Sequence, residues 1–242
     1  MSAQSIAAVE EEPRPRRPSH RLFVGMGLLS LVVVFFGFAR TYFLKAHYGT
    51  PPLTMLFHAH GAVFTAWVLL FTSQAALIAR HHTRLHQKLG VAAGILAIAV
   101  IGLGTAVVIV TGRRDLAAGD AAVFFQLAGG LAGMIIFAFL VGFALRQRRV
   151  PETHKRLMLL ATLTFLGPAL FRLPFVVGRP GIGFMLYLAP LFLVILYDRV
   201  SRGHIHRSYL YGGILVLAVM PPVWIPLSLS PAWRRFATWL LS

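Results

Sequence analysis

The stretch LGVAAGILAIAVIGLGTAVVIVT, residues 89–111, decides what kind of protein this is. It contains no charged side chain, and basic residues stand close to both of its ends, at Lys88 and Arg113. A helix that crosses the hydrocarbon core of a bilayer needs about 20 mainly apolar residues. The stretch therefore predicts a membrane-spanning helix.

The composition extends this prediction to the whole chain. Of the 242 residues, 57% are hydrophobic and only 12% are charged, whereas soluble domains carry about 25% charged residues. We therefore expect an all-α, polytopic transmembrane bundle. Its seven predicted spans are residues 22–44, 56–79, 89–111, 122–145, 156–177, 182–198 and 209–229.

The two ends of the chain differ from these spans. Residues 1–20 are polar and predict a disordered cytoplasmic tail, which leaves residues 21–242 as the transmembrane domain. The last segment, residues 231–242, combines tryptophan and phenylalanine with two arginines at helical spacing, which is typical of a helix lying in the membrane interface. Three prolines in the seventh run predict that its outer end is kinked or unwound.

The basic residues predict the orientation of the bundle. With seven spans, 15 of the 23 lysines and arginines fall on the side of the N-terminus, and such an excess marks the cytoplasmic side. This distribution over short loops also accounts for the net charge of +16. We therefore expect a lipid bilayer as the partner, and no nucleic acid.

Several classes of activity find no support in the sequence. Without cysteine there are no disulfides, thiolate metal sites or iron–sulfur clusters. No carboxylate lies in the interior of a predicted span, since Asp198 is only the last residue of one, and this disfavours proton- or ion-coupled transport. Zinc-protease, nucleotide-phosphate and dinucleotide motifs are also absent. The sequence assigns no catalytic residue, no enzyme class and no oligomeric state.

Polar side chains gather at two depths of the predicted bundle. The outer layer contains arginines, histidines and an amide that could stabilise an anionic group or a quinone carbonyl, unless the arginines simply reach the headgroups. Two of its members are also candidate metal ligands. They are two residues apart on one predicted helix, so on a regular helix they point about 200° apart. The layer comprises Arg40, His58, His60, Gln126 and Arg172, with His58 and His60 as the metal candidates.

The inner layer holds His86 and His154, each at the start of a predicted span and flanked by basic residues. Two neutral imidazoles from two helices at one depth are what a six-coordinate b-type haem requires. The alternative is that both are interfacial polar residues which help basic loops to meet anionic headgroups.

Three histidine motifs carry a resemblance to known proteins. LFHAHGAVFTAW, TRLHQKLG and THKRLMLLAT resemble a group of bacterial multi-pass inner-membrane proteins without an assigned activity. This resemblance, over residues 35–175, implies a location in the bacterial cytoplasmic membrane. A weaker likeness to b-type transmembrane cytochromes and ferric-reductase domains implies haem, but here no span carries the two widely spaced histidines of those proteins.

Three functions follow as hypotheses. The first is b-type haem binding by His86 and His154, with electron transfer to a quinone or another redox partner near Arg40, Gln126 and Arg172. The second is metal handling by His58 and His60. The third is a non-catalytic accessory or assembly role, which requires no feature beyond the membrane helices that the composition predicts.

Overall fold

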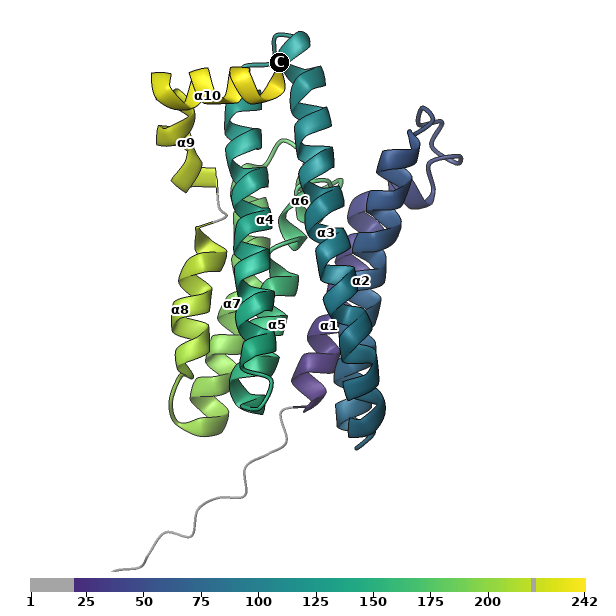
Figure 1. Cartoon of the computed structure of the whole chain (residues 1–242), viewed down its shortest axis with the longest axis vertical. Coiled ribbons are helices and arrows are strands. Elements are labelled where there is room, and N and C mark those ends of the chain that lie inside the picture. Colours follow the sequence, from purple (N-terminus) through teal and green to yellow (C-terminus); the bar gives the residue numbers. More distant parts are fainter. Residues whose placement is uncertain (1–19, 219–220) are drawn as a thin grey trace, which may run out of the picture.

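The chain is helical throughout the part that the computed structural model describes, residues 20–218 and 221–242, and no β-strand occurs there (Figure 1). The predicted tail lies outside this part except for its last residue, His20, which begins the first helix. In chain order the helices are α1 (His20–Phe38), the π-helical turn η1 (Ala39–Phe43), α2 (Met55–Ala79), α3 (Thr83–Ala117), α4 (Val123–Arg146), α5 (Pro151–Leu163), α6 (Leu166–Leu170), α7 (Pro180–Arg202), α8 (Arg207–Leu217), α9 (Pro221–Leu229) and α10 (Pro231–Leu241).

Five of the described helices are long and apolar enough to cross a membrane. Large apolar side chains on their surfaces are exposed, as at Ile98 (72%) and Ile135 (69%), which suits contact with lipid. The five, with η1 continuing α1, are His20–Phe43, Met55–Ala79, Thr83–Ala117, Val123–Arg146 and Pro180–Arg202.

Proline and glycine place several helix ends. Pro180 occupies the first turn of α7, where a missing N–H costs nothing, and Gly203 ends the helix with a φ of 77°. At α10 the hydroxyl of Ser230 accepts a hydrogen bond from the N–H of Trp233, with Pro231 in the first turn. These boundaries follow from local backbone chemistry.

Two predicted spans are each divided into shorter helices. The run over 156–177 breaks after Leu163, because Pro168 has no N–H for the carbonyl of Thr164 and its ring crowds that oxygen. At the same place the side-chain hydroxyl of Thr164 donates a hydrogen bond to the carbonyl of Ala161, at 2.7 Å. The run over 209–229 is divided between α8 and α9, in keeping with its prolines.

We name the ends of the bundle by their connections. The basic end carries the connections 80–82, 147–150 and 203–206, which contain or adjoin many of the basic residues, and lies at the bottom of Figure 1. The opposite end carries the connections 44–54, 118–122 and 171–179. The α3 helix begins at Thr83, six residues before the predicted span, so that His86 lies within its first turns.

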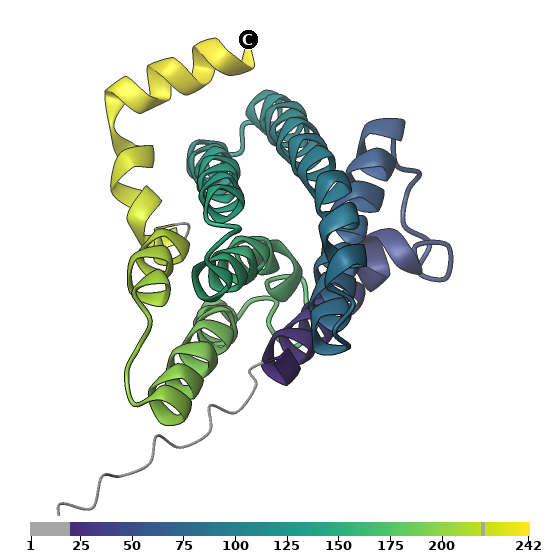
Figure 2. The same ribbon diagram turned by 60° about the horizontal axis from the view of Figure 1, so that its bottom comes forward.

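The core is centred on α4 and α5. Figure 2 shows α1–α3 on one side of these helices and α7–α10 on the other. Phe137 and Leu140 of α4 and Leu160 of α5 have no exposed surface and belong to the main apolar cluster.

The C-terminal helix lies across the opposite end of the bundle, over α3 and α4 (Figure 1). Its Trp233 donates the indole N–H to the carbonyl of Phe124 at 2.8 Å, and Ala237 and Leu241 are buried. Phe236 and Trp239 remain exposed. A helix thus forms over the predicted residues, while its location in the membrane interface stays a prediction.

Candidate functional site

Two imidazoles from different helices lie together at the basic end. His86 and His154 are each the fourth residue of their helix, α3 and α5, and their ring centroids are 6.3 Å apart with an angle of 84° between the ring planes. The helices that carry them pack mainly on other neighbours, α3 on α2 and α4, and α5 on α4 and α8. The two histidines thus lie close together, as the haem hypothesis requires, while haem binding itself stays a prediction.

Hydrogen bonds orient the pair. Nδ1 of His154 lies 2.8 Å from the carbonyl oxygen of Ala144. A carbonyl can only accept, so Nδ1 donates in this hydrogen bond, and Nε2 is the ring nitrogen that is left to bind a further group. The side-chain amide of Gln74 donates to the carbonyl of His86 at 3.2 Å. Nδ1 of His86 is buried and has no hydrogen-bond partner among the described residues.

The spacing of the rings suits one metal ion between them. A metal–imidazole bond is about 2.0 to 2.1 Å long and the nitrogen lies about 1.1 Å from the ring centre, so two imidazoles on opposite sides of one ion have centroids about 6 Å apart. In the described part of the chain no group of three or more histidine, cysteine, aspartate or glutamate side chains could hold an ion. Further ligands would therefore come from a bound group, as the porphyrin nitrogens do in haem.

Two glycines follow His86 on the same face of α3. Gly90 and Gly94 follow His86 by four and eight residues and therefore share its face. A Cβ atom built on either glycine would meet no atom within 4 Å. This face of α3 is therefore open at the two glycines.

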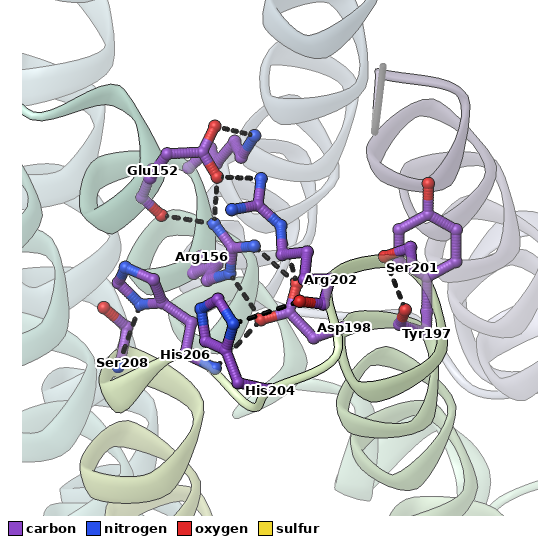
Figure 3. Close-up of polar contacts among 10 residues, drawn as sticks. Glu152, Arg156, Tyr197, Asp198, Ser201, Arg202, His204, His206 and Ser208 are labelled. Atoms are coloured by element: carbon purple, nitrogen blue, oxygen red, sulfur yellow. Dashed lines mark hydrogen bonds and ion pairs between the residues drawn. The ribbon is translucent and has the colours of Figure 1, made fainter. Parts of the chain in front are cut away.

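A buried ion pair involves Arg156, two residues after His154 on α5 (Figure 3). Nε and Nη2 of Arg156 donate to the two carboxylate oxygens of Asp198, at 3.2 and 2.5 Å, and the side chains of both residues are only 1–2% exposed. The guanidinium group also lies over the ring of Tyr209, 5.3 Å from its centroid. The backbone N–H of His206 donates to Asp198 at 3.0 Å. The pair thus ties α5 to α7 and to the connection before α8.

Glu152 extends this network to the first turn of α5. Its carboxylate accepts hydrogen bonds from Lys155 at 2.6 Å, from Arg156 at 2.7 Å and from Arg202. Burial alone would raise the pKa of Glu152, but the hydrogen bonds and charges of Lys155 and Arg156 outweigh it and lower the pKa to about 2. Because His154 lies two residues further along the same helix, the network fixes the turn that carries this imidazole.

Sequence reasoning missed the network. It assigned no role to Asp198, the one carboxylate of the sixth run, or to Arg156, which stands at the edge of the fifth. An isolated acid and an isolated base at the same end of two apolar runs are the signal that could have found it, since charges at such positions are paired when buried.

At the opposite end the structure brings together part of the predicted outer layer. His60 of α2, Gln126 of α4 and Arg172, just after α6, line one cavity of about 760 Å³. Arg172 donates to the carbonyl of Pro168 at 2.7 Å, and its guanidinium lies 5.1 Å from the centroid of Phe38.

The other two members of that layer lie outside the cavity. Arg40 is exposed in η1, with its guanidinium 5.3 Å from the centroid of the Tyr48 ring. His58 is exposed beside Tyr42, with ring centroids 5.8 Å apart. The α2 helix is regular from Met55 onward, and the N–H of His58 bonds to the carbonyl of Thr54. His58 and His60 therefore do not face a common site.

Comparison with known proteins identified no relative of this chain. No protein-family model matches the chain, and neither a curated protein nor a solved structure is significantly similar to it.

Proposed function

We propose that this protein binds one b-type haem between His86 and His154 and transfers electrons in the membrane. The observation that carries the proposal is the pair of imidazoles on α3 and α5 with centroids 6.3 Å apart. The hydrogen bond from His154 to Ala144 supports it, because ligating histidines commonly donate their second ring N–H to a carbonyl or carboxylate.

The surroundings of the pair support haem over a bare metal ion. Two imidazoles satisfy the axial positions, and the open face at Gly90 and Gly94 suits a flat macrocycle. Arg84 and Lys88 are exposed on the first turns of α3 and add positive charge at the end of the bundle that carries the pair. Bound haem would supply reversible one-electron chemistry.

The proposed setting is the bacterial cytoplasmic membrane, with seven passes and the N-terminus inside. The α5–α6 and α8–α9 pairs would form the two passes that no single long helix makes. The concentration of basic residues at one end of the bundle supports this orientation, and the resemblance of the three histidine motifs supports the bacterial setting.

The first test is the visible spectrum of the purified protein in mild detergent, oxidised and then reduced with dithionite. We expect a Soret band and sharp α and β bands after reduction, because low-spin bis-histidine haem gives them. The bands should disappear in His86→Ala and in His154→Ala. His82→Ala is the matched control, since His82 is exposed at the same end of the bundle, and it should leave the spectrum unchanged.

A second variant separates loss of haem from loss of fold. Methionine can replace histidine as an axial ligand and raises the reduction potential, so His86→Met should keep haem with an altered spectrum and a higher potential. A colourless wild-type protein, even after expression with a haem precursor, would overturn the proposal and favour the accessory role.

A further inference from the structure

The cavity at the opposite end has the size and lining of a ligand site. Its volume of about 760 Å³ lies within the range of about 300 to 1,000 Å³ that is usual for small-molecule pockets. Its wall is mainly apolar and is built from helices on both sides of the bundle, from Val34 of α1 to Trp224 of α9. A ligand with a large apolar part would fit such a wall.

Three side chains in the wall, those of His60, Arg172 and Trp224, contain N–H groups or ring nitrogens with few partners, whereas Arg114 and Asp115 of the same wall pair with each other. Nδ1 of His60 and Nε1 of Trp224 are buried without a hydrogen-bond partner among the described residues. Within the same part of the chain no carboxylate pairs with Arg172, whose one hydrogen bond is to Pro168. A cation without a carboxylate partner and two ring nitrogens without a hydrogen-bond partner, in a mainly apolar wall, suit a ligand with accepting oxygen atoms.

Aromatic rings line the same cavity. The ring of His60 lies 4.1 Å from that of Phe64, centroid to centroid, and Phe64 lies 4.8 Å from Phe165. Phe57 and Phe171 are among the other aromatic residues of the wall. Flat rings pack well against other flat rings, so the lining favours a ligand with a conjugated ring over one with only an alkyl chain.

We infer that this cavity binds a lipid-soluble quinone, with its carbonyl oxygens toward His60 and Arg172 and its apolar tail along the aromatic wall. Binding depends on the cavity alone, whereas a role of the quinone as electron partner rests on the proposed haem function.

The α2 helix runs past both sites. The cavity extends along it to Val68, which is six residues, or about 9 Å along the helix axis, from Gln74. The amide of Gln74 donates to the carbonyl of His86. A quinone in the cavity would therefore lie on the helix that contacts the histidine pair.

The test measures binding of decylubiquinone to the detergent-purified protein by quenching of tryptophan fluorescence, with oleate as competitor. His60→Leu and Arg172→Gln should each raise the Kd about tenfold or more, because each removes a hydrogen bond to the ligand in an apolar cavity. His58→Leu and Arg40→Gln are the matched controls, since these residues lie at the same end but outside the cavity, and they should change the Kd less than about twofold.

Three results would overturn the inference. One is equal weakening by the cavity variants and the matched controls, the second is binding of oleate in preference to the quinone, and the third is no saturable quenching in the wild type. The same titration on His86→Ala distinguishes this proposal from the haem proposal: quinone binding should persist there without haem, and its loss would overturn a separate cavity site.

Discussion

Asp198 and Asp115 both accept hydrogen bonds from an arginine, but water reaches the two pairs to different extents. Asp198 and Arg156 are almost completely buried, whereas Arg114, the partner of Asp115, has a side chain that is 70% exposed. In the buried pair each charge depends on the other for its stabilisation. In the exposed pair water solvates the remaining partner.

This contrast predicts different costs for the same substitution. Asp198→Asn should lower the free energy of unfolding by about 3 to 5 kcal/mol, because it leaves Arg156 charged and buried with only Glu152 as a counter-ion. Asp115→Asn should lower it by no more than about 1 kcal/mol. Unfolding in mixed detergent micelles, followed by circular dichroism, measures both values, and equal costs would contradict the burial described for Asp198.

At the scale of the elements, the close approach of α1 to α6 positions one wall of the cavity. A Cβ atom on Gly37 of α1 would overlap the backbone of Ala169, which no side-chain rotation can relieve. Gly25, on the same helix, has no atom within 4 Å of such a Cβ. An added methyl group would therefore clash at Gly37 but would be accommodated at Gly25.

Alanine at these two positions should have opposite effects. Gly37→Ala should destabilise the protein by about 1 to 3 kcal/mol, because α6 must move away from α1, and should weaken decylubiquinone binding, because Arg172 follows α6. Gly25→Ala should stabilise it by about 0.5 to 1 kcal/mol through helix propensity. The check is thermal unfolding of both variants, together with the quinone titration. A neutral Gly37→Ala would show that α1 and α6 are not in close contact.

At the scale of the whole molecule, the connections alternate between the two ends of the bundle. The connection before α4 lies at the opposite end, and the connections before α5 and α8 lie at the basic end (Figure 1). Since the sequence contains no cysteine, a single introduced cysteine reports on one connection at a time.

Labelling of such cysteines should show the proposed orientation. A membrane-impermeant maleimide should label Ala118→Cys on spheroplasts, and should label Arg148→Cys and His204→Cys only after the membrane is permeabilised, because the latter two lie at the basic end that we place in the cytoplasm. The wild-type protein serves as the unlabelled control. The reverse pattern would invert the orientation, and labelling of all three on intact spheroplasts would contradict alternating passes.

The sequence by itself determined the five long apolar helices of the described part of this protein. Runs such as residues 89–111 require a membrane helix because their backbone groups must bond internally in lipid. Prolines and glycines set many of the boundaries, and the matching depth of His86 and His154 could be predicted because both stand at the start of a helix at the same end. These features depend on local backbone chemistry and hydrophobic length.

Only the tertiary structure decided which polar side chains meet. Arg40 and Arg172 were equivalent by depth, but only Arg172 lines the cavity. Arg156 and Asp198 are 42 residues apart and pair because α5 and α7 pack side by side at the basic end. The physical reason is that sequence fixes how deep a residue lies along its helix, whereas the rotation of that helix, set by packing against its neighbours, decides where the side chain points.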